Sequence, residues 1–328
     1  MKVILPLAGK GTRLLPLTKR VPKPLIRVAG RPIMDYVMDS VKGLAVEELI
    51  VITGHLREVV ERYVVEHYAV PARFVEQRTL DGTAGAVNLA RPYVSGPVLI
   101  IFVDTLFDAD LSLIRTTDAD GILWAKEVED YRRFGVIVTD PSGYMTRIVE
   151  KPKEPISRLA NIGLYYVRDW ETLFDGIAAV LQRPAHPGGE FYLTDAFQYM
   201  VDRGRRLRVE EATGWYDCGK VETLLETNRH LLEHGRARQP TAGAGCTVVP
   251  PVYVADGVRI EDATIGPNVA VEAGSYIAGS AITNSILGRN VRVVRATVRD
   301  SLIGDDQVIE GRSVTGSVVD LGETVAAR

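Results

Sequence analysis

The residues best suited to chemistry lie near the start of the chain, where an apolar run at 3–7 opens into a glycine-rich loop. Gly9 and Gly11 lack a Cβ, so the backbone there can approach a ligand closely and can adopt positive φ without strain. Backbone N–H groups in such a loop can converge on an anion, and Arg13 and Lys23 add two cations. This spacing predicts a pocket for a polyphosphate.

The loop differs from two common phosphate-binding motifs. A dinucleotide-binding Gly-x-Gly-x-x-Gly would require glycine where the chain has Leu14. A Walker A loop would close with Gly-Lys-Ser/Thr, which this loop does not. An ordinary tight turn is the alternative for two glycines after a strand. Motifs elsewhere in the chain are therefore needed to distinguish a turn from a binding site.

The elements that would position these residues follow an alternating pattern up to about residue 235. Strands are predicted at 2–7, 48–53, 72–76, 97–103, 121–127, 135–139 and 162–167, and helices at 33–43, 55–67 and 219–234. This alternation predicts an α/β fold, with a mostly parallel sheet covered by helices on both faces. Ligands of such sheets bind beyond the carboxyl ends of the strands, which is where the glycine loop would lie.

A different pattern follows the linker predicted at 236–246, which is rich in Pro, Gly and Ala. We therefore predict two domains, 1–235 and 247–328. Small apolar residues in the second recur about every six positions: Ile265, Val271, Ile277, Leu287, Val293, Ile303 and Ile309. This hexapeptide period predicts a left-handed parallel β-helix, in which 284–288 and 300–304 are two copies of one coil. A β-sandwich is the alternative, but its hairpin pattern is absent.

Composition narrows the functional classes. The chain has 328 residues and a formal net charge of −3, so it lacks the basic excess of a nucleic-acid-binding protein. Two cysteines give no disulfide framework and favour a reducing compartment. No apolar segment is long enough to span a bilayer. We therefore expect a cytoplasmic protein that binds neither nucleic acid nor membrane.

The N-terminal string resembles the activating motif of sugar-1-phosphate nucleotidyltransferases, or NDP-sugar pyrophosphorylases. That motif reads Gly/Ala-Gly-x-Gly-Thr-Arg-Leu, then Pro-x-Thr, then Pro-Lys-Pro-Leu, and residues 8–14, 16–18 and 22–25 match it in order. The resemblance implies a Rossmann-like nucleotidyltransferase sheet. The implied reaction joins an NTP to a sugar-1-phosphate, releases pyrophosphate and uses Mg²⁺. Glucose-1-phosphate with dTTP or UTP is the favoured substrate pair.

The resemblance also assigns roles to individual residues. Arg13 and Lys23 would be the catalytic cations, and Gln77 would recognise a pyrimidine base. The full set implied for nucleotide binding is Leu7, Ala8, Gly9, Gly11, Thr12, Gln77, Gly82 and Thr83. The set implied for the sugar phosphate is Gly135, Glu150, Lys151 and Trp215, with Glu150 and Lys151 in a Glu-Lys-Pro motif.

Two aspartates are expected to hold the metal. Asp104 follows the apolar run 98–103, where an unpaired carboxylate would be costly, and Asp217 lies in a segment that resembles the family's Trp-x-Asp-x-Gly. Taken singly, each could instead cap a helix or a turn. The Asp-x-Asp pairs at 108–110 and 118–120 resemble metal motifs of glycosyltransferases, but we interpret them as solvated loop acids because Asp104 already ends the buried run.

Two further segments resemble the family with differences. Phe134 replaces the tyrosine of a Tyr-Gly pair that packs against the sugar. Residues 190–195 resemble a Glu-x-x-x-Thr-Asp stretch, and we predict that Thr194 or Asp195 caps the helix that follows.

The β-helix raises the question of a second activity. Hexapeptide acyltransferases commonly use a histidine base, but all five histidines precede the predicted linker. We therefore expect the β-helix to support a homo-oligomer. Two alternatives stay open for the whole chain. One is a mannose-1-phosphate guanylyltransferase, which 80–85 also resembles, and the other is a non-catalytic regulatory subunit that binds a nucleotide-sugar.

Overall fold

The structure is a computed structural model that describes residues 1–240 and 245–327. The chain forms two compact units, one of Met1–Gly9 and Val37–Trp215 and the other of Lys10–Tyr36 and Tyr216–Arg328. Each unit has its own hydrophobic core. The two units are distinguished by the contacts between their residues. The domain boundaries at 235 and 246 were predicted from the sequence pattern, and they stay a prediction. The predicted linker falls in part, at 241–244, outside the described residues.

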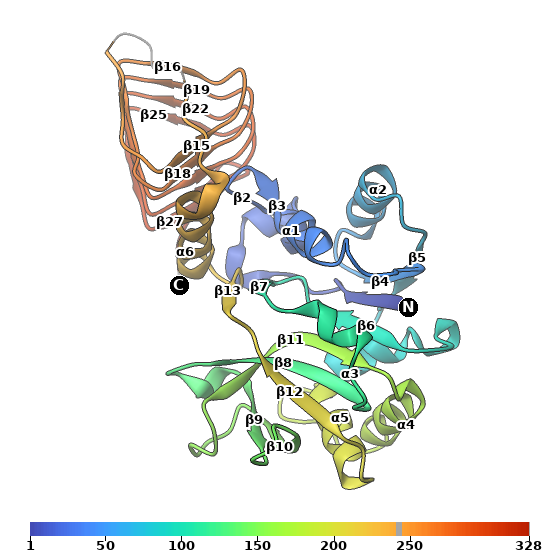
Figure 1. Cartoon of the computed structure of the whole chain (residues 1–328). Helices are drawn as coiled ribbons and strands as arrows, with labels where there is room; N and C mark the ends of the chain where they lie inside the picture. The colour runs from blue at the N-terminus through green and yellow to red at the C-terminus, as the bar shows by residue number, and fades with distance from the viewer. Residues whose placement is uncertain (241–244, 328) are drawn as a thin grey trace. The chain divides into compact units, whose positions relative to one another are not determined.

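The first unit contains a nine-stranded sheet, in which β8 lies between β11 and β12 in Figure 1. Its order is β10-β9-β11-β6-β1-β4-β5, with β8 paired to β11 and β12 paired to β8. The strands are β1 (Lys2–Pro6), β4 (Glu48–Thr53), β5 (Ala72–Glu76), β6 (Val98–Ile101), β8 (Gly121–Glu127), β9 (Gly135–Thr139), β10 (Met145–Glu150), β11 (Leu159–Val167) and β12 (Leu207–Glu211).

The predicted α/β sheet is confirmed, and it is mixed. Strands β6, β1, β4 and β5 are parallel, whereas β11 is antiparallel to β6, β8 and β9. The connections between β8 and β11 contain no α-helix among the described residues, and short connections join antiparallel strands. The central strand β1 is buried on both faces, since Val3, Ile4 and Leu5 are fully covered.

Helices cover both faces of this sheet. Helices α3 (Thr83–Asn88), α4 (Trp170–Leu181) and α5 (Leu193–Asp202) share one core with β1, β4 and β6. Helix α2 (Arg57–His67) packs on β4 and β5, on the other side of the sheet in Figure 1. Helix α1 (Ile33–Ser40) continues from the second unit into the first. Among the described residues no helix has the length and apolarity needed to cross a membrane.

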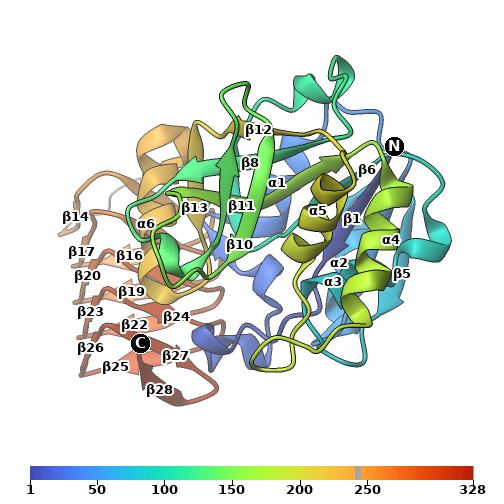
Figure 2. The ribbon, with the colours of Figure 1, turned by 90° about the horizontal axis from the view of Figure 1, so that it is seen from below.

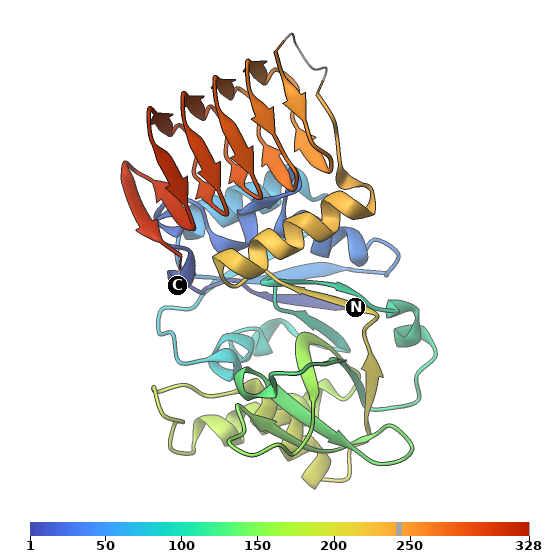
Figure 3. The same cartoon turned by 90° about the vertical axis from the view of Figure 1, so that its left-hand side faces the viewer.

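The second unit contains the predicted parallel β-helix, whose coils are stacked in Figures 2 and 3. Three ladders form its faces. The first is β14 (Thr247–Val248), β17 (Thr264–Ile265), β20 (Ala281–Thr283), β23 (Thr297–Arg299) and β26 (Ser313–Thr315). The second is β15 (Val252–Val254), β18 (Val269–Val271), β21 (Ile286–Leu287), β24 (Leu302–Ile303), β27 (Ser317–Asp320) and the antiparallel β28 (Glu323–Ala326). The third is β16 (Arg259–Glu261), β19 (Tyr276–Ala278), β22 (Arg292–Val294) and β25 (Val308–Glu310).

The coils are shorter than three full hexapeptides. Ile286 pairs with Leu302, so 284–288 and 300–304 are copies of one coil, as predicted. The seven predicted core residues are all buried. The spacing between core residues, however, is five positions rather than six from Ile277 to Ile282, and again from Ile282 to Leu287. Non-glycine residues with positive φ, such as Asn284 (φ 41°), tighten the corners. The predicted left-handed winding stays a prediction.

Buried serines complete the hydrogen bonding at the corners of the coils. Backbone N–H groups of Ala296 and Ser301 donate to Ser280 and Ser285 of the preceding coil, at 3.1 and 3.2 Å. Buried backbone donors must be paired, and a short hydroxyl side chain does this without widening the coil.

The rest of the second unit consists of α6 (Val221–Leu231), which lies along the stack of coils in Figure 3, and the segment Lys10–Tyr36. Helix α6 continues in a π turn, Leu232–Arg236, and ends at Gly235 with φ 93°, as predicted. The N-terminal segment contains 3₁₀ turns η1 (Thr12–Leu14), η2 (Leu17–Lys19) and η3 (Lys23–Leu25), followed by the hairpin of β2 (Arg27–Val28) and β3 (Arg31–Pro32).

Candidate functional site

Three strands of the first unit bring polar groups together around Gly135. The side chain of Asn161 on β11 donates from Nδ2 to the carbonyl oxygen of Gly135 at 3.0 Å. A Cβ at Gly135 would lie 2.7 Å from Oε2 of Glu150 on β10 and would collide with Nδ2 of Asn161. Glycine is therefore required here because a carboxylate and an amide occupy the space of its missing side chain.

Glu150 and Lys151 form the polar part of this cluster. Burial raises the pKa of the Glu150 carboxyl, and the neighbouring Lys151 ammonium opposes that shift. Lys151 has φ 46°, and its N–H donates to the carbonyl of Phe134 at 3.0 Å. Its exposed Nζ lies 3.4 Å from the hydroxyl of Tyr192 and 5.0 Å from that ring's centre. A non-glycine residue in this backbone region is strained, and such strain is concentrated at functional sites.

Asn161 is a candidate site residue that was not predicted from the sequence. It is a polar residue within the apolar strand β11, and the register of β11 against β8 shifts between Asn161 and Tyr165. The hydroxyl of Tyr165 donates to Oδ1 of Asn161 and fixes the orientation of the amide. Burial raises the pKa of Tyr165, so this hydroxyl stays protonated as a donor. The sequence did offer one signal for Asn161, which is a polar residue shortly before a glycine, Gly163, within a strand.

An aromatic pair adjoins this cluster through Phe134, which precedes Gly135 in the sequence. The rings of Phe134 and Trp215 meet edge to face, with centres 4.9 Å apart and planes at 75°. The indole Nε1 of Trp215 is buried and has no hydrogen-bond partner within the described residues. The predicted sugar-phosphate residue Trp215 therefore packs on the residue that precedes Gly135.

Gln77 is buried and its amide is held by the loop that follows it. Its Nε2 donates to Oδ1 of Asp81 at 3.0 Å and to the carbonyl of Gly82 at 3.4 Å. The carboxylate of Asp81 lies against Gly85, where a Cβ would collide with it. Since a carboxylate accepts hydrogen bonds, the NH₂ group of Gln77 must face Asp81. The side-chain carbonyl of Gln77 is then the group left for a ligand.

Gly82 and Thr83 connect this loop to α5. Gly82 has φ 106°, and a Cβ there would collide with the backbone of Phe191. The hydroxyl of Thr83 accepts the N–H of Leu193 at 2.9 Å, so Thr83 caps the start of α5 from outside.

The predicted cap at Thr194 or Asp195 is therefore wrong. Helix α5 begins at Leu193, so Thr194 and Asp195 lie inside the helix. Its N-cap residue is Tyr192, whose side chain forms no cap. Asp195 instead pairs with Nε2 of His186 at 2.6 Å.

The first part of the glycine loop belongs to the first unit. Leu7 and Ala8 are buried, and the N–H of Leu7 donates to the carbonyl of Ile52 at 2.8 Å. Gly9 is exposed, and a Cβ there would meet nothing within 4 Å. Gly11 adopts positive φ, whereas Gly9 does not.

The second part of the loop belongs to the second unit. Gly11 has φ 61° and its carbonyl accepts the hydroxyl of Thr18 at 3.0 Å. The 3₁₀ turn η1 begins with the exposed Thr12. Arg13 is exposed and forms no ion pair with any residue that the structure describes. Lys23 begins η3, and a Cβ at Gly11 would lie 3.4 Å from its Cβ.

The two predicted metal-binding aspartates are placed differently from simple helix caps. Asp104 is half-buried in the turn between β6, which already ends at Ile101, and β7 (Thr105–Asp108). Asp217 ends β13 (Gly214–Asp217), and its Oδ1 accepts the N–H of Gly219 at 2.7 Å. The N-cap position of α6 is Lys220, so Asp217 does not cap that helix.

Other acidic residues have structural partners. Among the described residues no group of three or more His, Cys, Asp or Glu side chains could hold a metal. Asp110 caps the 3₁₀ helix η5 (Leu111–Arg115), and Asp120 accepts the N–H of Arg206 at 2.8 Å. A metal bound here would use one or two carboxylates together with substrate oxygens and water, which is the donor set that Mg²⁺ prefers.

Comparisons with known proteins identify the family of this chain. The family model described as nucleotidyl transferase matches residues 2–234. The chain belongs to the nucleotidyl transferase family. The predicted enzyme class, a sugar-1-phosphate nucleotidyltransferase, is thereby confirmed.

Several relatives resemble this nucleotidyltransferase over much of their length. A "Bifunctional protein GlmU" of Methanococcus aeolicus is 30% identical over 97% of this chain and 81% of its own. The "UTP--glucose-1-phosphate uridylyltransferase AglF" of Haloferax volcanii is 31% identical over 71% of this chain and 97% of its own. A "Glucose-1-phosphate thymidylyltransferase" of Streptomyces antibioticus is 27% identical over 97% and 92%.

The solved structures agree on the fold. The crystal structure of a UDP-glucose pyrophosphorylase complexed with UDP-glucose superimposes with a TM-score of 0.63, at 24% identity, over 71% of this chain and 98% of that one. At this identity the similarity shows that the two proteins share a fold.

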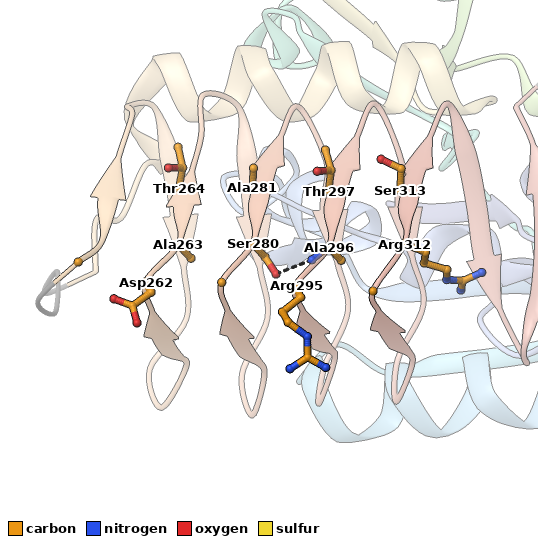
Figure 4. A pocket seen from close by; sticks show the side chains of 13 residues that line it. Asp262, Ala263, Thr264, Ser280, Ala281, Arg295, Ala296, Thr297, Arg312 and Ser313 are labelled. Carbon is orange, nitrogen blue, oxygen red and sulfur yellow. Dashed lines mark hydrogen bonds between the residues drawn. The ribbon is translucent and has the colours of Figure 1, made fainter.

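The nucleotidyltransferase also has an open groove of about 520 Å³ on the β-helix, shown in Figure 4. It crosses successive corners, marked by Asp262, Gly279, Arg295 and Gly311. Ser280 within it already accepts the N–H of Ala296, and Arg295 pairs with Glu310 at 2.9 Å. None of the residues predicted for the reaction lines this groove, so we assign it no part in the reaction.

Proposed function

We propose that this enzyme transfers a nucleotidyl group from dTTP or UTP to glucose-1-phosphate, and that it forms an NDP-glucose and pyrophosphate. The relatives named for uridylyl and thymidylyl transfer to glucose-1-phosphate support this choice. The observation that carries it is the orientation of Gln77 by Asp81.

The base preference follows from hydrogen-bond polarity. With its NH₂ group directed at Asp81, Gln77 offers a ligand its carbonyl oxygen, which accepts hydrogen bonds. Uracil, thymine and guanine present a ring N–H donor on the edge that pairs with other bases, whereas adenine and cytosine present a bare ring nitrogen there. The relatives named for uridylyl and thymidylyl transfer favour uracil and thymine over guanine. A mismatched base would leave buried polar groups unpaired, and such mismatches discriminate strongly.

The sugar phosphate would be bound by the cluster around Gly135. Lys151 offers an exposed ammonium to the phosphate, and Glu150 offers carboxylate oxygens to sugar hydroxyls. Asn161 would add a further polar contact next to Glu150. The aromatic pair of Phe134 and Trp215 would support one side of this region.

The triphosphate would be bound by the glycine loop. Gly9, Gly11 and Thr12 offer backbone N–H groups near Leu7 and Ala8, and Gly82 and Thr83 would border the base. Arg13 and Lys23 would neutralise charge on the departing pyrophosphate. We assign Mg²⁺ to Asp104 and Asp217 on the resemblance of their motifs. Their carboxylate oxygens are suitable ligands for it, and bound Mg²⁺ would polarise phosphate oxygens.

The reaction requires no covalent intermediate on the protein. A phosphate oxygen of the sugar-1-phosphate attacks the α-phosphorus of the NTP, and the bond from that phosphorus to the β-phosphate oxygen breaks. The protein would bring two anions into line and lower their repulsion with Arg13, Lys23 and Lys151. Orientation of this kind supplies about 7–11 kcal/mol of a barrier.

A substrate matrix tests this proposal. Purified enzyme is mixed with each of four NTPs, each of several sugar-1-phosphates, and Mg²⁺, and pyrophosphate release is measured. We expect release with UTP or dTTP and glucose-1-phosphate, and none when any component is left out. Release only with GTP and mannose-1-phosphate would replace the substrate assignment. No release in any combination would favour the regulatory subunit. The cytoplasmic location and the homo-oligomer stay predictions, and light scattering would test the second.

A further inference from the structure

The coils share one position on a ladder of the β-helix at which two of them carry an acid. Val254, Val271, Leu287, Ile303 and Val319 pair in sequence along this ladder, so the residues that follow them are equivalent. These are Ala255, Glu272, Gly288, Gly304 and Asp320. Two coils with glycine at this position thus separate the two coils that carry an acid.

Both acids are buried. Asp320 is 0% exposed and Glu272 is 3% exposed. The Asp320 carboxylate lies over Gly304, where a Cβ would collide with it, and Gln307 donates to its Oδ1 at 3.3 Å. A buried carboxylate without a cation is strongly unfavourable, so each of these two needs a positively charged partner.

The partners of both acids come from the segment that carries the glycine loop. Arg20 donates to Asp320 from Nη2 at 2.6 Å and from Nε at 3.3 Å, and it also donates to the carbonyl of Asp305 at 2.8 Å. The hydrogen bond to Asp320 raises the pKa of Arg20. Arg27 forms an ion pair with Glu272 at 2.9 Å.

Arg20 is connected to the loop through η2. Thr18, within η2, is fully buried and donates from its hydroxyl to the carbonyl of Gly11. A Cβ at Gly11 would lie 2.9 Å from Cγ2 of Thr18, so loop and turn are in direct contact. Lys23 lies between the two anchored arginines in the sequence. The ladder of Glu272 and Asp320 therefore holds both ends of the stretch that includes Lys23.

We propose that Arg20 with Asp320, and Arg27 with Glu272, form a clamp by which the β-helix positions the glycine loop and its cations for the reaction. The β-helix then has a positioning role in catalysis that is separate from assembly. Three further contacts support it. Lys19 pairs with Glu323 at 2.7 Å. Asn228 of α6 accepts the N–H of Ala29 at 2.9 Å and donates to the carbonyl of Asn268 at 3.2 Å. This inference rests on the proposed function for its kinetic test.

The test uses the full-length enzyme with the double variant Arg20→Gln/Asp320→Asn. Replacing both partners leaves no unpaired buried charge, so the protein should keep a melting temperature close to that of the wild type. We expect kcat to fall about 10- to 100-fold, because small displacements of catalytic groups cost that much. KM for the sugar-1-phosphate should stay within about twofold, since its binding groups are untouched. Hydrogen exchange should become faster at residues 11–25 only.

A milder variant and a matched control complete the design. Arg20→Lys keeps the charge but loses the two-pronged hydrogen bond, and it should lower kcat by a smaller factor. Glu310→Gln removes an ion pair with Arg295 elsewhere on the β-helix and should leave kinetics unchanged.

Two results would overturn the proposal. One is wild-type kcat in both Arg20 variants. The other is a loss of activity with unchanged exchange at residues 11–25. If the wild type itself releases no pyrophosphate, the proposed function fails, but the exchange experiment still decides whether the clamp orders the loop.

Discussion

The two compact units place their candidate functional residues in different kinds of position. In the first unit these residues follow the ends of strands: Gln77 after β5, Asp104 after β6 and Lys151 after β10. In the second unit the β-helix repeats one coil, and its informative residues are those that depart from the repeat, Glu272 and Asp320.

The difference has a physical cause. Each strand end in a sheet leads into its own loop, so neighbouring loops can carry unrelated chemistry. A coil in a solenoid is flanked by copies of itself, so a residue that suits one coil suits the next. A buried charge in one coil then has no opposite charge in the neighbouring coils, so its ion-pair partner must come from outside the stack. Arg20 and Arg27 are those partners here.

The largest effect should come from a strand-end carboxylate. We expect Asp104→Asn to lower kcat by about a thousandfold, since a loss of several kcal/mol of charge stabilisation corresponds to such a factor. Its melting temperature should be that of the wild type, because Asp104 is only half-buried and outside the core. Pyrophosphate release and thermal unfolding measure the two quantities. The control is Asp110→Asn, which affects a 3₁₀ cap. Activity within tenfold of the wild type would remove Asp104 from the metal site.

A smaller effect is expected where the first unit depends on a glycine. Gly135→Ala would push Glu150 and Asn161 apart, and overpacking of this kind costs about 1–3 kcal/mol. We expect KM for the sugar-1-phosphate to rise about tenfold, with kcat changed less, in steady-state kinetics. Gly96→Ala is the matched control because a Cβ there meets nothing within 4 Å. An unchanged KM would show that the sugar phosphate binds elsewhere.

The sequence predicted most of the sheet because hydrophobic runs and helical periods are local signals. Every strand expected in the first unit occurs, and Gly235 ends the predicted helix. The antiparallel insertion of β11 was not predicted, since strand direction depends on pairing between distant segments. The cap of α5 was misplaced for a similar reason. Its capping residue, Thr83, whose hydroxyl accepts the N–H of Leu193, is far away in the sequence.

The β-helix was predicted from its period, but the clamp was not. A period reveals which residues face the core, and the seven named for it do. An acid at the end of a coil looks like an ordinary surface residue until the coil length is known to be 16, because only then do Glu272 and Asp320 become equivalent. Asn161 was missed similarly, because its partners Gly135 and Tyr165 meet it only after strand pairing.

A modest effect is expected on base selection. Asp81→Ala removes the acceptor that orients the amide of Gln77, so either end of that amide can then face a base. We expect the preference for UTP or dTTP over CTP to weaken about tenfold in kcat/KM. The control is Asp118→Ala, an exposed aspartate of the same unit. An unchanged preference would mean that other groups select the base.

The smallest effect compares one carboxyl from each unit, the half-buried Glu150 and the buried Glu272. Burial raises the pKa of both Glu150 and Glu272 above the ordinary value of 4.5, against the opposing effects of Lys151 and Arg27. The folded protein therefore keeps a proton on each at pH values where the unfolded chain has released it. The stability contributed by each falls as pH rises through a window that begins near 4.5 and ends above the folded pKa.

Glu150→Gln should accordingly unfold at a higher temperature than the wild type at neutral pH, and this advantage should vanish as pH falls below that window. Glu272→Gln also leaves Arg27 without its carboxylate, so its gain at neutral pH should be smaller than that of Glu150→Gln. Thermal unfolding over a pH series measures both. The two differ in kinetics: Glu150→Gln should raise KM for the sugar-1-phosphate, whereas Glu272→Gln should lower kcat through the clamp. A stability advantage that grows on acidification would contradict the pKa shift, and a matching KM change in both variants would contradict the separation of roles between sheet and β-helix.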